Sequence, residues 1–346
     1  MLGISTACLP GPRLNRGLAE FFKSGIEIGF ETFEVGVSSV KVSKKDILNW
    51  QRRLNLNVAS VHNIFTDKPI DPENRRGDLL ASSDEKKREE TIELTLKTAK
   101  FAEELGARAV VLHAGYIKEE LLRENCREFK EMWSKGESSL QVLREHLSEM
   151  RARYACEYVE RVIKSMKTLC RENHKILFCL EPRVNFYEIP NIEEMEEIFD
   201  RVKEVNLCYW HDTGHCQVQE NLGLSIQEAW LAAFGERMVG IHLHDTRLLK
   251  DHLPPGMGDV DFSLIKKHLR QETIKIVEVG DRVTKEELKK SVCQLGAVVN
   301  YQEMVIPQQF KNSQDDLSWL STTITLILFE DFQHSIQGRF DIPNLN

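Results

Sequence analysis

A histidine or an acidic residue stands at the end of six short apolar runs in this sequence. The densest group is YWHDTGHCQV, in which His211, Asp212 and His215 fall within five residues. The other runs end in VASVH, VVLH, FCLEPR, GIHLHD and KIVEVG, and they supply His62, His113, Glu181, Arg183, His242, His244, Asp245 and Glu278. Apart from His252, which follows in the next loop, only four of the eleven histidines lie elsewhere: His146, His174, His268 and His334.

The types of these residues indicate a metal centre. A single histidine or glutamate at the end of a strand is most often a rim residue or a helix cap, so no one position decides the matter. Several carboxylates confined to one place, however, repel one another and raise one another's pKa unless a cation joins them. Two glutamates, one aspartate and one histidine form an oxygen and nitrogen ligand set that suits Mn²⁺, Mg²⁺, Co²⁺ or Zn²⁺. We therefore predict a divalent metal as cofactor.

The apolar runs are spaced as eight strands that alternate with helices. Helical stretches such as SDEKKREETIELTLKTAKFAEELG carry apolar residues at steps of three and four and stop at a glycine. Near-continuous apolar strands are typical of a parallel sheet covered by helices, and the closed form with eight strands is the (β/α)8 TIM barrel. A doubly wound open sheet is the alternative, although its usual G-x-G-x-x-G turn is absent. The expected strands are Leu2–Ala7, Thr32–Val37, Asn57–Val61, Ala109–Leu112, Ile176–Leu180, Asn206–Trp210, Met238–Leu243 and Ile274–Val277.

A barrel would gather the candidate residues at one rim, because functional side chains of this fold project from the carboxyl ends of the strands. Two segments exceed a minimal barrel. Residues 116–173 are charged and helical, enough for two or three inserted helices between the fourth and fifth strands. Residues 298–346 follow the last expected helix and contain the β-prone stretch STTITLILFEDF. We expect one domain, residues 1–297 with the insertion, and a C-terminal extension that acts as a lid, a strap or an oligomer contact.

Composition excludes several other classes of protein. The 346 residues carry a net charge of −8 and a pI of about 5.8, which argues against nucleic acid or an anionic membrane as partner. Apolar runs are far shorter than the ~20 residues of a membrane span, and the first residues lack the pattern of a signal peptide. The eight cysteines form no C-x-x-C pair, which disfavours disulfides and structural zinc. We expect a cytoplasmic protein and leave a homo-oligomer open.

The order of the motifs resembles that of the xylose isomerase-like TIM-barrel superfamily. This group includes sugar and sugar-phosphate isomerases and epimerases and, more distantly, endonuclease IV. The likeness runs over about residues 1–297 and rests most on DTGH and DHLPPGMGDVDF. It implies that one divalent metal is held by Glu181, Asp212, His242 and Glu278. His244 competes with His242 as ligand, because both lie on the same strand face two residues apart.

The resemblance also implies contacts with the substrate or with a second metal, which we leave open. The residues expected to make them are His62, His113, Arg183, His215, His244 and His252. The implied activity is that of a metal-dependent isomerase or epimerase acting on a sugar, sugar phosphate or keto-polyol. In this reaction Glu181 and Glu278 move a proton through a metal-bound enediolate. Arg183 and His215 bind hydroxyl or carboxylate groups of the carbohydrate and steady the developing charge.

Three other functions stay open. The first is an endonuclease IV-like phosphodiester hydrolase, whose three-metal site would use His62, His113, His215 and His252. Against it, Lys250 replaces that family's aspartate, and the acidic chain lacks a surface for phosphate backbones. The second is a dehydratase or lyase on a polyol or keto acid, and the third is a non-catalytic metal-binding barrel. The sugar-binding loop also departs from the epimerases, because position 187 is tyrosine where they carry glutamate, and Glu188 comes one residue later.

Overall fold

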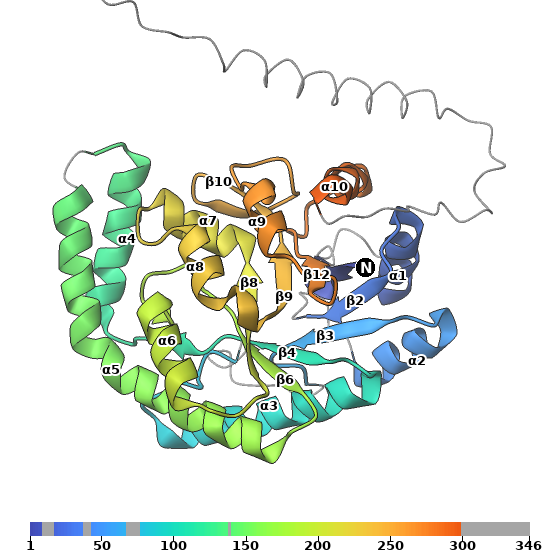
Figure 1. Ribbon diagram of the computed structural model, residues 1–346, viewed down its shortest axis with the longest axis horizontal. Coiled ribbons are helices and arrows are strands. Elements are labelled where there is room, and N and C mark those ends of the chain that lie inside the picture. The colour runs from blue at the N-terminus through green and yellow to red at the C-terminus, as the bar shows by residue number, and fades with distance from the viewer. Residues whose placement is uncertain (9–16, 37–42, 67–76, 138–139, 299–346) are drawn as a thin grey trace, which may run out of the picture. The chain divides into compact units, whose positions relative to one another are not determined.

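Eight parallel strands close into a barrel with helices around it (Figure 1), as predicted. The computed structural model describes residues 1–8, 17–36, 43–66, 77–137 and 140–298. The barrel order is β1-β12-β9-β8-β6-β4-β3-β2. These strands are β1 (Leu2–Ser5), β2 (Thr32–Val35), β3 (Val58–His62), β4 (Ala109–Leu112), β6 (Leu177–Leu180), β8 (Leu207–Asp212), β9 (Met238–Leu243) and β12 (Ile274–Val277).

All eight predicted strands are present; three have the predicted bounds, and the ends of the others differ by one or two residues. The first strand stops at Ser5 because Thr6–Cys8 forms a 3-10 turn, η1. The sixth barrel strand, β8, runs two residues farther than predicted and ends at Asp212. Val37, the predicted end of the second strand, lies outside the described residues.

Helices follow most of the strands and begin and end at recognisable sequence signals. Asp84 caps the first turn of α3, and Gly106 ends that helix with a positive φ of 72°. A capping box of Asn191 and Glu194 starts α6. None of the described helices is long and apolar enough to cross a membrane. The helices of the barrel are α1 (Gly17–Ile28), α2 (Lys44–Leu54), α3 (Glu85–Leu105), α6 (Ile192–Arg201), α7 (Thr213–Asn221), α8 (Gln227–Phe234), α9 (Phe262–His268) and α10 (Lys285–Val298), with a 3-10 turn, η3 (Gly235–Arg237), after α8.

The insertion after the fourth barrel strand consists of two helices, α4 (Glu120–Ser134) and α5 (Leu140–Glu172). They pack side by side along one flank of the barrel in Figure 1. Arg151 of α5 is buried and pairs with Glu194 at 2.6 Å, so the insertion is anchored to α6. The predicted C-terminal extension lies outside the described residues except for Val298, the last residue of α10, so its role stays a prediction.

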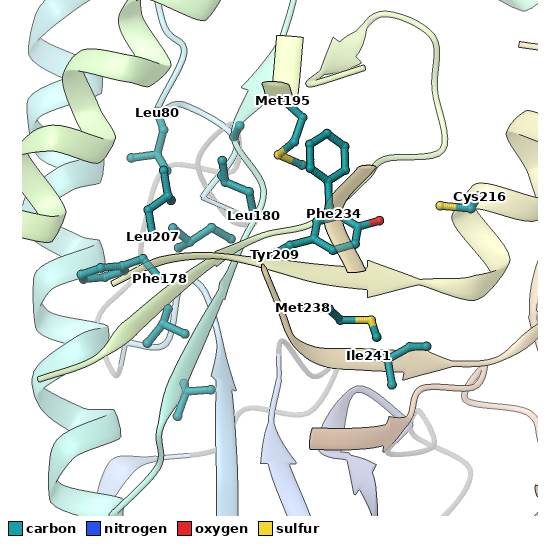
Figure 2. Packing of buried hydrophobic residues seen from close by; sticks show 14 of the residues in the cluster. Leu80, Phe178, Leu180, Met195, Leu207, Tyr209, Cys216, Phe234, Met238 and Ile241 are labelled. Carbon is teal, nitrogen blue, oxygen red and sulfur yellow. The ribbon is translucent and has the colours of Figure 1, made fainter. Parts of the chain in front are cut away.

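Each barrel strand sends alternate side chains to opposite faces, because successive residues of a strand point in opposite directions. One set, with Phe178 and Tyr209, packs against the surrounding helices, as Figure 2 shows; the ring of Tyr209 lies 5.3 Å from that of Phe234. The other set fills the barrel with a small apolar cluster that includes Cys179 and Trp210. Two residues farther along the same face lie Glu181 and Asp212. The inward face of a strand therefore runs from apolar packing to the candidate site.

Four short strands form ribbons outside the barrel, none of which the sequence predicted. The first ribbon pairs β5 (Gly115–Tyr116) with β7 (Glu188–Ile189). The second pairs β10 (Asp245–Arg247) with β11 (Lys250–Leu253), beyond the end of β9. These ribbons connect residues in the loops that follow β4, β6 and β9, and so they help to fix the surroundings of the candidate site.

Candidate metal centre

Four buried side chains converge at the carboxyl ends of the barrel strands. One ligand atom from each lies within 4.8 Å of those of the others. The four are the residues that the resemblance implied as metal ligands: Glu181, Asp212, His242 and Glu278. They come from β8, β9 and the residues directly after β6 and β12, which are consecutive strands of the barrel. Even the most accessible of them, Glu278, exposes only 8% of its surface.

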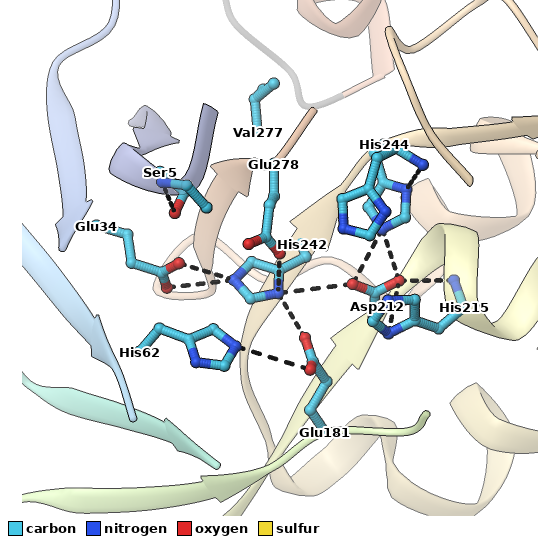
Figure 3. A network of polar contacts seen from close by, with 12 residues as sticks. Ser5, Glu34, His62, Glu181, Asp212, His215, His242, His244, Val277 and Glu278 are labelled. Carbon is cyan, nitrogen blue, oxygen red and sulfur yellow. Dashed lines mark hydrogen bonds and ion pairs between the residues drawn. The ribbon is translucent and has the colours of Figure 1, made fainter. Parts of the chain in front are cut away.

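The Nδ1 atom of His242 lies at the centre of this group (Figure 3). It is 2.6 Å from Oε1 of Glu181, 3.1 Å from Oε2 of Glu278 and 3.6 Å from Oδ2 of Asp212. One imidazole nitrogen therefore faces three carboxylates that belong to three different strands. His244, the competing candidate, contacts only Asp212 among these carboxylates.

The charges of this group fit a divalent cation. Burial by itself would lower the pKa of His242, but Glu278, Glu34 and Glu181 raise it well above its usual range. Burial would raise the pKa of Glu181, but the charge of His242 and a hydrogen bond from His113 hold it well below. Several carboxylates with one imidazolium leave an excess of negative charge in a buried place, which a metal ion relieves. Three carboxylates and one imidazole are also a donor set that such ions accept.

Glu34, which the sequence analysis did not single out, lies on the opposite side of the His242 ring. Its carboxylate oxygens are 3.1 and 3.2 Å from Nε2 of His242. Glu34 is fully buried in β2 and also accepts a hydrogen bond of 2.8 Å from Ser60. The signal in the sequence is a lone glutamate inside the short strand TFEV, all of whose residues are buried.

A second group of possible ligands joins His62, His113 and Glu181. Nε2 of His113 is 3.1 Å and Nε2 of His62 is 3.9 Å from the same Glu181 oxygen, Oε2. Nδ1 of His113 is 2.9 Å from Asp78, which the sequence analysis also missed. Burial and the neighbouring His113 lower the pKa of His62. Glu181 is therefore shared between this group and the first one.

A third group of possible ligands consists of His215, His244 and His252. The rings of His244 and His252 stack with centroids 4.3 Å apart. Both nitrogens of His244 have partners, because Nε2 lies 2.8 Å from Asp212 and Nδ1 accepts the backbone N–H of His252 at 2.9 Å. The backbone N–H of His215 donates to Oδ1 of Asp212 at 2.7 Å, and Asp212 thereby caps the N-terminus of α7. Asp251 lies 3.3 Å from His252, and this contact outweighs burial and raises the pKa of His252 to about 9.

Arg183 lies beside the first group, next to Glu181. Its Nη1 donates to Oε2 of Glu181 at 2.9 Å, and the whole side chain is buried. Glu188 lies on the other side of the guanidinium, 3.7 Å from Nε. Oxygen Oε2 of Glu188 accepts two hydrogen bonds from Asn185, at 2.7 and 2.9 Å. The glutamate that is displaced by one position relative to the epimerases therefore faces Arg183 and its own loop.

Besides Arg183, two residues of the strand-end motifs lie outside the three groups. His211 points away from the barrel interior, where it contacts the hydroxyl of Tyr209 at 2.7 Å and the side chain of Gln227 at 3.2 Å. Asp245 accepts backbone hydrogen bonds from Thr246, Gly256 and Val260. It therefore organises the loop that carries the PPGMGDV sequence.

Comparison with known proteins gives the same fold. The sequence matches the family described as xylose isomerase-like TIM barrel over residues 22–294. A D-tagatose 3-epimerase-like protein superposes with a TM-score of 0.61 at 20% identity, covering 87% of this chain and 98% of its own. The 3-keto-D-glucoside 4-epimerase of E. coli has a TM-score of 0.61 at 14% identity, covering 86% of this chain and 98% of its own.

The D-psicose 3-epimerase of Clostridium cellulolyticum H10, solved with D-tagatose, has a TM-score of 0.58 at 14% identity and covers 86% of this chain and 98% of its own. Among proteins with curated descriptions, none matches the sequence. The family match spans most of the barrel, and the closed eight-stranded sheet agrees with it. The chain belongs to the xylose isomerase-like TIM barrel family.

Proposed function

We propose that this protein is a divalent-metal-dependent isomerase or epimerase that acts on a sugar, a sugar phosphate or a related keto-polyol. The observation that carries the proposal is the convergence of two buried glutamates, Glu181 and Glu278, on Nδ1 of His242. Two carboxylates on either side of one buried point can serve as a pair of proton carriers. The solved neighbours carry the names of sugar epimerases, which supports a small carbohydrate as substrate.

In this proposal the metal would be held by Glu181, Asp212, His242 and Glu278. A bound divalent cation would polarise the carbonyl group of the substrate and make the neighbouring carbon more acidic. One of the two glutamates would remove the proton from that carbon, and the other would return it. Return to the opposite face of the same carbon gives an epimer. Return to the former carbonyl carbon, while the proton of the neighbouring hydroxyl passes to the former carbonyl oxygen, gives an isomer.

The remaining site residues would orient the substrate. Arg183 is already charged and buried beside Glu181, where its donors can reach an oxygen that gains negative charge during the reaction. The imidazoles at the same rim would contact hydroxyl groups of the substrate. The residues proposed for these contacts are His62, His113, Arg183, His215, His244 and His252.

Solvent exchange of a carbon-bound hydrogen tests the proposal without knowledge of the product. Metal-loaded protein is incubated in D₂O with pooled ketoses, aldoses, their phosphates and keto-polyols, and NMR detects deuterium next to a carbonyl. We expect exchange in the wild type and none in Glu278→Gln. The control is Glu194→Gln, which changes a buried glutamate of α6 that pairs with Arg151, outside the three groups. Conversion of a substrate without uptake of deuterium would contradict proton transfer.

A second candidate, an endonuclease IV-like metal-dependent phosphodiester hydrolase, is favoured by one observation. The three groups of possible ligands form a series in which Glu181 belongs to two groups and Asp212 of the first contacts His244 of the third. Asp251 lies 4.0 Å from His215 and could take the part of the aspartate that Lys250 replaces. Such a series could hold three ions.

The number of bound metal ions separates the two candidates. Protein is loaded with Mn²⁺, Co²⁺ or Zn²⁺, passed through a desalting column and measured by elemental analysis. About one ion per chain, lost in Glu181→Gln, supports the isomerase or epimerase, whereas about three ions support the hydrolase. Cleavage of DNA with an abasic site, combined with no deuterium exchange into any sugar, would decide for the hydrolase.

A further inference from the structure

We infer that Glu34 is a positioning residue of the metal centre, which fixes the orientation and tautomer of His242 and thereby sets the affinity for the metal. This inference rests on the proposed metal-dependent function. Glu34 is not among the residues expected to bind metal or substrate. It acts through His242, from the side of the ring opposite the three carboxylates.

The position of Glu34 is held by contacts from two neighbouring strands. Glu34 on β2 pairs in register with Ser60 on β3, and the Ser60 hydroxyl donates to Oε2 at 2.8 Å. Both side chains are fully buried. A carboxylate in such a place keeps a fixed orientation, because rotation would leave its oxygens without hydrogen-bond donors in a region that water does not reach.

Packing alone does not determine whether a nitrogen or a carbon atom of His242 faces the metal centre. The ring lies between Trp210, at a centroid distance of 5.1 Å, and His62, which stacks at 5.9 Å with an interplanar angle of 6°. These contacts define the plane of the ring. Half a turn of the ring about its Cβ–Cγ bond would keep the ring in that plane. It would place carbon atoms where the two nitrogen atoms now lie.

The carboxylate of Glu34 removes this ambiguity. It accepts hydrogen bonds only, so Nε2 of His242 must carry the hydrogen that it donates, at 3.1 and 3.2 Å. The lone pair of a neutral His242 then resides on Nδ1, the atom that faces Glu181 and Glu278. Carboxylates that accept from the second nitrogen of a metal-binding histidine raise the basicity of the ligand, and their loss typically weakens metal binding about 10–100-fold.

Two variants separate this role from a merely structural one. Glu34→Met removes the acceptor and keeps the length of the side chain, whereas Glu34→Gln keeps a carbonyl oxygen that can still accept from Nε2. The affinity for Co²⁺ is measured by competition with a coloured chelator, and the visible absorption of bound Co²⁺ reports the ligand geometry. We expect a loss on the order of 100-fold in Glu34→Met and on the order of 10-fold in Glu34→Gln. Glu194→Gln, another buried glutamate, should bind Co²⁺ as the wild type does.

The outcomes are distinguishable. Wild-type affinity in a folded Glu34→Met, or an equal loss in both variants, would overturn the inference while leaving the proposed function intact. If Glu34→Met does not fold, wild-type affinity in Glu34→Gln alone would overturn it. A wild-type protein that takes up no Co²⁺ would overturn both the inference and the proposed function. Partial retention in Glu34→Gln, with an altered Co²⁺ spectrum in Glu34→Met, would support the inference.

Discussion

His242 and His244 lie two positions apart on the inward face of the chain at the end of β9, and both rings are fully buried. Nδ1 of His242 faces three carboxylates, whereas His244 contacts Asp212 and the backbone of His252. His242→Ala should therefore lower the affinity for Co²⁺ more than about 100-fold, and His244→Ala only about 10–100-fold, as is typical of a residue that orients a ligand. Titration of both variants against the same chelator measures the difference. The reverse order would identify His244 as the ligand.

Gly214, in the DTGH motif, allows His244 to lie close to the start of α7. A methyl group at this position would overlap the imidazole ring of His244, so Gly214→Ala should displace the ring and with it the contact to Asp212. We expect a loss of about 1–3 kcal/mol in the free energy of unfolding, because the site has no space for the added carbon, together with weaker binding of Co²⁺. Chemical denaturation and metal titration give the two values.

Gly235→Ala is the matched control. Gly235 has a helical φ of −56°, and the nearest atom to an added methyl group would be Nδ1 of His268 at 3.4 Å. Alanine favours helical backbone over glycine in both variants, so only the steric overlap differs between them. A Gly214→Ala protein that is as stable as Gly235→Ala and binds metal like the wild type would refute the close approach of His244.

At the scale of the element, β8 presents Asp212 to the candidate metal centre and His211 to the layer of helices. Burial lowers the pKa of His211 to about 4, so the folded protein holds it neutral between Tyr209 and Gln227. A pKa below the unfolded value means that the unfolded chain binds the proton first as the pH falls. The stability associated with His211 is therefore complete above about pH 6.5 and is lost between about pH 6.5 and pH 4.

His211→Gln should flatten this part of the stability profile. The lowered pKa of His211 corresponds to about 3 kcal/mol in the free energy of unfolding, which the wild type loses between about pH 6.5 and pH 4. The variant carries no titrating group at this position, so it should not lose this stability over the same range. Urea denaturation at several pH values between 7 and 4 measures both profiles. The same change at His174, which is exposed, is the control and should leave the wild-type profile unchanged. Parallel profiles for wild type and His211→Gln would contradict a buried neutral histidine.

The elements could be predicted largely because strands and helices of this barrel have clear local signals. Apolar runs of four to six residues gave all eight barrel strands, and a final glycine, Gly106, marked the end of α3. The ribbons β5–β7 and β10–β11 were missed, because their two to four residues have no apolar pattern. In addition, β5 and β7 belong to different loops, which follow β4 and β6. The predicted end of β8 was two residues too early, because Asp212 is both the last residue of this strand and the N-cap of α7.

Prediction of the site failed where it depended on which face of a strand points inward. Glu34 sits in the middle of β2, so no strand-end rule finds it, and its inward direction follows only from closure of the barrel. His211 and Asp212 are adjacent and both buried, and they point to opposite faces; here the sequence had already indicated Asp212, and not His211, as the ligand. Asp78 reaches His113 from a loop whose path no local pattern specifies. Each of these contacts arises from the tertiary arrangement.

At the scale of the whole molecule, the candidate metal centre joins parts of the chain that only the folded barrel brings together. The proposed ligands extend from Glu181 to Glu278 and lie on four consecutive strands of the barrel, β6, β8, β9 and β12. An unfolded chain cannot present this set of donors, so the metal should bind the folded state alone and stabilise it by mass action.

Thermal and chemical unfolding with and without metal test this coupling. At a free Mn²⁺ concentration of about 100 times the dissociation constant, the free energy of unfolding should rise by about 2.7 kcal/mol, and a chelator should reverse the gain. The control is Asp212→Asn, because asparagine still accepts a hydrogen bond at the N-terminus of α7 but offers a neutral, weaker ligand. Its stability should change little with Mn²⁺. A wild-type protein whose unfolding is indifferent to Mn²⁺, Co²⁺ and Zn²⁺ would show that four buried side chains from four strands meet without holding an ion.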